Sequence, residues 1–108
     1  IASGSWAKDI RYILENAGAS DLFPVILGKE SASREKPHPD IFLNAAEKLG
    51  CAPSECFVLE DALKGLYAAK EAGMPCIILR NPLNQNINFD EADLIFESLE
   101  DFVSALKA

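Results

Sequence analysis

The sequence has no apolar run that approaches about 18 residues, the shortest length that usually crosses a membrane as a helix. It also has no cluster of lysine and arginine, since 10 basic residues stand against 17 acidic ones and give a net charge of −7. Neither a membrane nor a nucleic acid is therefore an expected partner. A phosphate group can still bind locally, because nearby donors and a metal ion outweigh net charge.

Cysteine is sparse, with only Cys51, Cys56 and Cys76. The number is odd and no two of them have the Cys-x-x-Cys spacing, so neither a disulfide framework nor a zinc site is expected. We expect three buried, reduced thiols in a cytoplasmic protein.

The length of 108 residues suits one domain with one core, spanning 1–108. Hydrophobic residues make up 49% of the chain and charged residues 25%, which is typical of a globular domain. The chain opens with IASGSW and has no initiator methionine. Because the first two residues look like the end of a strand, we expect a piece of a longer protein.

Apolar periodicity and turn residues divide the chain into alternating helices and strands. Ser5 and Asp61 are expected to cap helices, and Gly18, Gly50 and Gly73 to end them. Helices are predicted at about 6–17, 40–49, 62–72 and 98–106, and strands at 24–28, 56–60, 75–79 and 92–96.

This alternation predicts an α/β fold in which helices cover both faces of a parallel sheet. Such sheets bind ligands at the carboxyl ends of their strands. Three polar groups follow predicted strands: Ser3 and Ser5, the loop that holds Lys36, and the pair Glu60 and Asp61.

The adjacent acids Glu60 and Asp61 directly follow an apolar strand. Neighbouring carboxylates repel each other unless a cation lies between them, and Mg²⁺ typically takes one or two carboxylates together with waters and a phosphate oxygen. They are candidate metal ligands; the alternative is that Asp61 only caps a helix and Glu60 is exposed.

Ser3, Gly4 and Ser5 offer hydroxyls and backbone N–H groups at a helix start, where anions bind; simple capping by Ser5 is the alternative. Lys36 stands before two prolines, which stiffen the loop that holds it. It could supply the fixed positive charge that a transferring phosphoryl group needs, or it could be an ordinary solvated lysine. His38 lies between those prolines and is expected to be structural or exposed.

Taken together, these segments resemble the haloacid dehalogenase (HAD) superfamily, in the branch that includes β-phosphoglucomutase and phosphoglycolate phosphatase. The similarity covers most of the chain. The stretch IASGS looks like the second motif of that family, KPHPDIF like the third, and VLEDALKGLYAAKEAGMPCIIL like the fourth.

The resemblance implies a Rossmann-like three-layer α/β/α core and an Mg²⁺-dependent enzyme acting on a small phosphorylated metabolite. Lys36 would contact the phosphoryl group and the nucleophilic aspartate, and the Ser3 hydroxyl would bind the phosphoryl group. Glu60 and Asp61 would hold Mg²⁺. The reaction would pass through an aspartyl-phosphate, as in a phosphatase or a phosphomutase.

Two departures are small. Ala62 follows the acidic pair where serine is common, and Glu35 precedes the lysine where glycine is frequent. A third departure is large, because the first motif, Asp-x-Asp-Gly-Thr, is absent and no Asp-x-Asp occurs in the sequence. The cap domain is absent too. We therefore expect an incomplete core whose first strand is missing from the middle of the sheet, between the segments carrying Ser3 and Glu60.

Two hypotheses follow. The chain is part of a HAD-type phosphatase or phosphomutase and is inactive alone, because it lacks the nucleophile. Alternatively, it is a non-catalytic module that works by association, since an open sheet edge invites pairing with a second copy or with a missing N-terminal segment.

Overall fold

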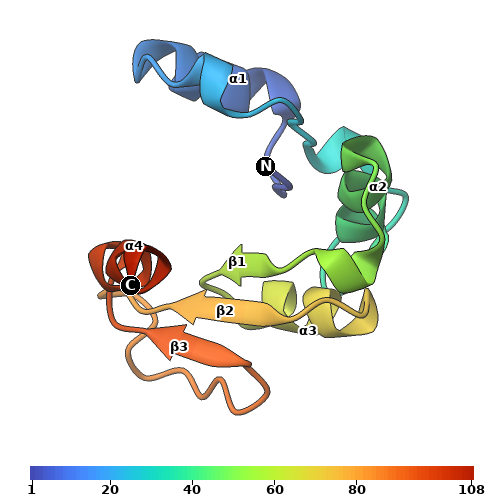
Figure 1. Cartoon of the computed structure of the whole chain (residues 1–108). Coiled ribbons are helices and arrows are strands. Elements are labelled where there is room, and N and C mark those ends of the chain that lie inside the picture. Colours follow the sequence, from blue (N-terminus) through green and yellow to red (C-terminus); the bar gives the residue numbers. More distant parts are fainter.

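The computed structural model describes residues 1–108. It contains four α-helices, three strands and three short 3₁₀ helices (Figure 1). None of its helices has both the length and the apolar character that crossing a membrane requires. In chain order the elements are α1 (Ala7–Asn16), η1 (Ser20–Leu22), η2 (Lys29–Ser31), α2 (Asp40–Leu49), η3 (Pro53–Glu55), β1 (Val58–Glu60), α3 (Leu63–Glu71), β2 (Cys76–Leu79), β3 (Leu94–Phe96) and α4 (Leu99–Lys107).

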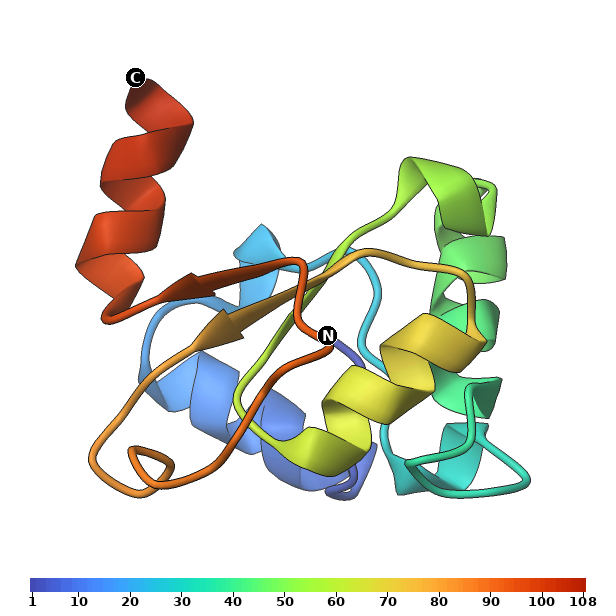
Figure 2. The same cartoon turned by 90° about the horizontal axis from the view of Figure 1, so that it is seen from below.

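The three strands form one parallel sheet in the order β1-β2-β3. Helix α3 packs against β1 and β2, whereas α4 lies on the other face, where its Phe102 ring meets Phe57 and Phe96 edge-on. Figure 1 shows α4 above the strands, and Figure 2 shows that α4 (red) extends beyond the sheet from the end of β3, while α3 (yellow) lies nearer the middle of the molecule. The predicted parallel α/β architecture is therefore confirmed, as a small part of a three-layer core.

The core is centred on α3 and β2. Leu66, Cys76 and Ile78 are fully buried there, and Phe89 joins them from the loop after β2. Asn84 is the only buried polar residue, and its side-chain amide donates to the carbonyls of Asp61 and Leu79 at 3.0 Å each. These bonds attach the 80–91 loop to the carboxyl ends of β1 and β2.

The predicted strand at 24–28 is almost absent. Only a single parallel bridge forms there, between Leu27 and Ala2. Backbone N–H groups of Ser3 and Leu27 donate across it, to Leu27 and Ile1, at 2.9 and 2.8 Å. A longer strand does not form because no further segment lies beside these residues to continue the ladder.

The cap predicted for the first helix is also wrong. Helix α1 begins after Trp6, and no side chain caps it from that position. The Glu30 carboxylate instead accepts from the Ala7 N–H at 3.0 Å. A carboxylate is favourable at this end because the helix dipole is positive there.

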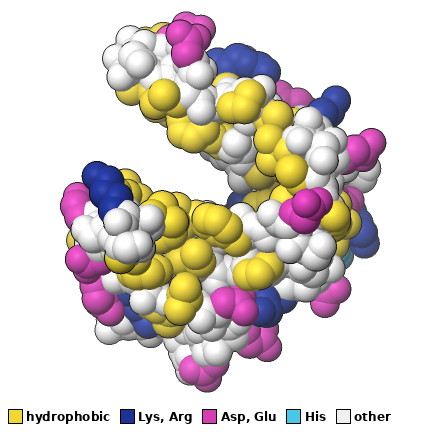
Figure 3. All heavy atoms as spheres, in the orientation of Figure 1, with side chains coloured by type: hydrophobic (Ala, Val, Ile, Leu, Met, Phe, Trp, Pro, Cys, Tyr) yellow, Lys and Arg dark blue, Asp and Glu magenta, His cyan; other side chains and the backbone are white.

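A groove separates the Ala2–Leu27 bridge from the sheet. It has a volume of about 260 Å³, and 11 of its 12 lining residues are hydrophobic. Ile1 and Ala2 form one wall, and Phe57 together with β1 forms the opposite one, with α2 at its base. Figure 3 shows the opening between the upper and lower parts of the molecule, with hydrophobic side chains (yellow) on both sides.

The edge of β1 that faces this groove has no partner strand. Val58 donates its N–H toward β2, to Pro75, at 2.8 Å. Since alternate residues of a strand face opposite neighbours, Leu59 directs its N–H and carbonyl into the groove. The residues Phe57 and Leu59 are 54% and 40% exposed. The structure thus has the gap that a strand between Ala2 and β1 would fill.

The three cysteines are free, as predicted, but only Cys76 is buried. Cys51 is exposed because it follows the glycine that ends α2, at the surface. Cys56 is half-buried, and burial raises the pKa of its thiol.

We expect the thiol-specific reagent 5,5′-dithiobis(2-nitrobenzoate) to modify Cys51 rapidly and Cys76 only after unfolding. Burial raises the pKa of Cys76 to about 11, and the thiolate is the reactive form. The colour released at pH 8, with and without urea, measures this difference, and Cys51→Ser identifies the fast phase. Equal rates for Cys51 and Cys76 in the folded chain would contradict the burial of Cys76.

Candidate active site

Lys36 is the centre of the candidate site. Its side chain is only 12% exposed, and its ammonium group donates to Glu60 Oε2 at 2.9 Å and to the Ala2 carbonyl at 3.2 Å. The Phe42 ring lies beneath the ammonium, with 4.8 Å between nitrogen and ring centroid. Lys36 therefore bridges the two walls of the groove, and the alternative of a solvated loop lysine does not describe it.

The loop that carries Lys36 is fixed at both ends. Arg34 forms an ion pair with Asp40 at 2.9 Å, which connects the loop to the first residue of α2. This hydrogen bond from Arg34 lowers the pKa of the Asp40 carboxyl. Asn44 of α2 donates to the Ser31 carbonyl at 2.6 Å. Loop and helix are thus joined around Lys36, while His38 points to solvent as expected.

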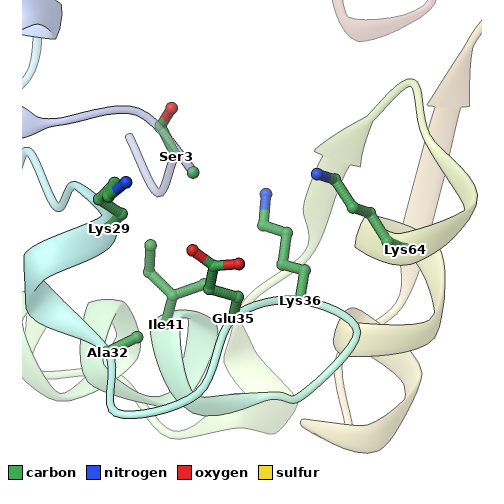
Figure 4. Close-up of a pocket in the computed structure, with 8 residues that line it drawn as sticks. Ser3, Lys29, Ala32, Glu35, Lys36, Ile41 and Lys64 are labelled. Carbon is green, nitrogen blue, oxygen red and sulfur yellow. The ribbon is translucent and has the colours of Figure 1, made fainter.

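Ser3 and Gly4 line the same pocket as Lys36 (Figure 4). The Ser3 hydroxyl oxygen accepts from the Ser5 N–H at 3.1 Å, so its own proton remains available to a ligand. Ser5 is exposed and does not line the pocket. Of the three residues predicted to bind phosphate in this segment, the structure brings Ser3 and Gly4 to Lys36.

Glu60 and Asp61 differ in their surroundings. Glu60 is 12% exposed and is held by Lys36, and its other oxygen accepts from the Asp61 N–H at 3.1 Å. Asp61 is exposed and accepts from the Asn81 amide at 3.1 Å. Helix α3 begins after Ala62 without a side-chain cap, so the predicted capping role of Asp61 is wrong and its carboxylate is directed elsewhere.

This donor set fits a magnesium ion only in part. The structure contains no group of three or more potential metal-ligating side chains, but Mg²⁺ needs only one or two carboxylates when water and phosphate oxygens complete its shell. Asp61 has one carboxylate oxygen without a hydrogen-bond donor. Glu60 would have to share its carboxylate between the metal and Lys36.

Two asparagines of the 80–91 loop belong to this site, although the sequence analysis did not identify them as site residues. Asn81 contacts the Asp61 carboxylate, and Asn84 holds the Asp61 carbonyl. The sequence shows them only as polar residues in a polar loop. One signal could have identified them. They follow the apolar strand CIIL, as the acidic pair follows the preceding strand, and the carboxyl ends of parallel strands meet at the same edge of a sheet.

Gly65 provides the space that Glu60 occupies. This glycine is buried in α3, and a Cβ at this position would overlap the Glu60 carboxyl carbon and Oε2. A methyl group here would therefore move the carboxylate that Lys36 holds.

We expect Gly65→Ala to lower the free energy of unfolding by about 2 kcal/mol, because overpacking costs more than the gain in helix propensity. In a Glu60→Ala background the same change should be neutral or stabilising by up to about 1 kcal/mol, since only the propensity term remains. Urea unfolding followed by circular dichroism measures both values. An equal cost in the two backgrounds would mean that Gly65 does not act through Glu60.

Comparisons with known proteins identify the family of this α/β chain. Residues 1–79 match the model of the haloacid dehalogenase-like hydrolase family, so the chain belongs to that family. This confirms the resemblance of the sequence motifs.

Two of the relatives are named as a putative phosphatase and a phosphatase. The chain is 37% identical over 106 residues to the putative phosphatase YhcW of Bacillus subtilis. These residues cover 98% of this chain and 48% of YhcW. It is 33% identical over 96 residues to phosphoglycolate phosphatase of Escherichia coli, covering 87% of this chain and 38% of the relative. The chain thus spans less than half the length of these relatives.

Solved structures show the same fold. The crystal structure of CbbY from Rhodobacter sphaeroides in complex with phosphate superposes with a TM-score of 0.83 at 31% identity, over 90% of this chain and 44% of CbbY. A putative β-phosphoglucomutase from Thermotoga maritima gives 0.84 at 23% identity, over 97% of this chain and 50% of that one. These neighbours support the expectation that the chain is part of a HAD core.

Proposed function

We propose that this chain provides the phosphate-binding lysine and the metal-binding carboxylates of an Mg²⁺-dependent HAD phosphatase or phosphomutase. The substrate would be a small phosphorylated metabolite, and the reaction would pass through an aspartyl-phosphate. The observation that carries the proposal is the position of Lys36, held by Ala2 and Glu60 beside Ser3. We propose a cytoplasmic location, as expected from the number and spacing of the cysteines.

Each residue has a defined task in this proposal. Lys36 places a fixed positive charge where negative charge develops on the phosphoryl oxygens, and Ser3 donates its hydroxyl proton to one of them. Asp61, together with Glu60, would hold Mg²⁺, which would neutralise further charge on the phosphoryl group. Asn81 keeps the Asp61 side chain in place.

A nucleophile is the component that these residues do not supply. The pocket around Lys36 contains no aspartate, and its one acid, Glu35, occupies the position before the lysine. Because Lys36 spans the groove between Ala2 and Glu60, a strand in that groove would end close to its ammonium. An aspartate at that strand end would be well placed to attack, so we expect the 108 residues alone to be inactive.

A fusion tests this proposal. The part of YhcW that this chain does not match is joined ahead of Ile1, and Mg²⁺-dependent phosphate release from a panel of phosphate monoesters is measured. We expect turnover in the fusion, none in the chain alone, and loss of turnover in the fusion carrying Lys36→Met. A folded fusion without turnover on any monoester would argue against the proposed role of these residues.

The groove also favours a second candidate function, that of a non-catalytic module acting by association. Its exposed backbone edge and apolar walls would let two copies of the chain pair along β1. If the edge of β1 is open, either as an association surface or because the core is incomplete, one of two results is expected. Sedimentation should show self-association, or the chain should unfold at a low concentration of denaturant. The variant Lys8→Ala, on the exposed surface of α1, is the control and should leave both results unchanged. A monomer that unfolds cooperatively at high denaturant would exclude an open sheet edge of this kind.

A further inference from the structure

Three lysines meet in one pocket although the protein is acidic. Lys29, Lys36 and Lys64 line it together with Ser3, and they are three of the seven lysines of the sequence. They come from three different elements: η2, the loop before α2, and α3. Such a concentration of positive charge in a chain of net charge −7 indicates an anionic ligand.

Two of these charges are not neutralised. The structure contains three ion pairs, and of the three lysines only Lys36 takes part in one of them, with Glu60. The ammonium of Lys64 points toward Lys36 from the α3 side, and Lys29 lies on the other side, next to Ser3 (Figure 4). Glu35 is the only acid that lines the pocket.

Lys29 is the more firmly placed of the two free cations. Its N–H donates to the Ser5 carbonyl at 2.8 Å, and its ammonium lies over the Trp6 ring, 4.5 Å from the centroid. This stacking limits the side chain without consuming its positive charge. Lys64 is exposed and reaches the pocket from the second residue of α3.

We propose that the substrate of this site carries two anionic groups, a phosphoryl group bound by Ser3, Lys36 and Lys64, and a second phosphate or carboxylate bound by Lys29. This inference rests on the proposed function, because it assigns the first anion to the phosphoryl site around Lys36. The second group lies on the Ser3 side of the pocket. The Glu35 carboxylate then repels a ligand that places an anionic group beside the loop that holds Lys36.

A matched pair of ligands tests the proposal on the 108-residue chain. Methylphosphonate has one anionic group and methylenediphosphonate has two, and isothermal titration without divalent metal gives the affinity of each. We expect the diphosphonate to bind roughly tenfold to a hundredfold more tightly, the gain from one further charge-assisted contact. Lys29→Met should abolish this difference, whereas Lys64→Met should weaken both ligands equally. Lys48→Met, on the exposed end of α2, is the control for net charge.

The outcomes separate the two proposals. Equal affinity for the two ligands, with both lost in Lys36→Met, overturns the second anion site and leaves the phosphoryl site intact. A preference for the diphosphonate that survives Lys29→Met, or that is reduced as much by Lys48→Met, also overturns it. Absence of binding by either ligand to a folded chain refutes both proposals.

Discussion

Replacing Lys36 by methionine is expected to lower the free energy of unfolding by about 3 kcal/mol. The substitution leaves the Glu60 carboxylate, 12% exposed, without the ammonium that it faces at 2.9 Å. An unpaired charge in such surroundings is costly, and removal of one partner of a buried ion pair typically destabilises by 3–5 kcal/mol. Urea unfolding at pH 7 measures the effect.

The double variant Lys36→Met with Glu60→Gln should recover much of this loss, because it removes the unpaired carboxylate as well. Lys70→Met is the matched control, since Lys70 pairs with Asp93 at 3.0 Å but both side chains are more than a third exposed. Water screens that pair, so its removal should cost far less. Equal losses for the two lysines would show that the Lys36 pair is not shielded from solvent.

Filling the groove is expected to produce the second large effect. In the YhcW fusion described above, a strand between Ala2 and β1 would bury the exposed parts of Phe57 and Leu59 and pair the free edge of β1. Burying a large apolar side chain contributes roughly 1.5–3 kcal/mol. We expect the free energy of unfolding to rise by about 3 kcal/mol or more.

Hydrogen exchange locates this effect on two neighbouring amides. The Leu59 N–H faces the groove and should exchange rapidly in the chain alone and slowly in the fusion. The Val58 N–H already donates to Pro75 at 2.8 Å and should be protected in both proteins. Rapid exchange at Leu59 in a folded fusion would place the added strand elsewhere.

Local signals predicted the helices well. The bounds of α2 agree with the prediction, because a proline precedes Asp40 and Gly50 takes a left-handed conformation with φ of 71° directly after Leu49. Ser98 caps α4 as expected for a helix opened by serine, accepting from the Asp101 N–H at 3.0 Å. These features depend on residues only a few positions apart.

Features that depend on distant residues were not predictable in the same way. The cap of α1 comes from Glu30, 23 residues further along the chain, and not from the adjacent Ser5. Asp61 forms its side-chain bond with Asn81 and not with α3. Strand residues 24–28 have the right composition for a strand, but a ladder also needs a neighbouring segment.

The candidate site was predicted through its motifs and only in part. Ser3 and Lys36 lie together, and Lys36 contacts Glu60 as one site requires. The sequence analysis did not identify Lys29 and Lys64 as site residues. A single lysine in a loop or on a helix carries no sequence signal that it lines a pocket. Only the fold brings them to Lys36.

The most direct test of the account is Mg²⁺-dependent phosphate release from a generic phosphate monoester by the purified 108-residue chain, compared with its Lys36→Ala variant. We expect no turnover above that variant, because lysine, serine and a metal ion cannot replace the nucleophile. Turnover that disappears in Lys36→Ala would contradict it, since another acid of this chain would then serve as the nucleophile.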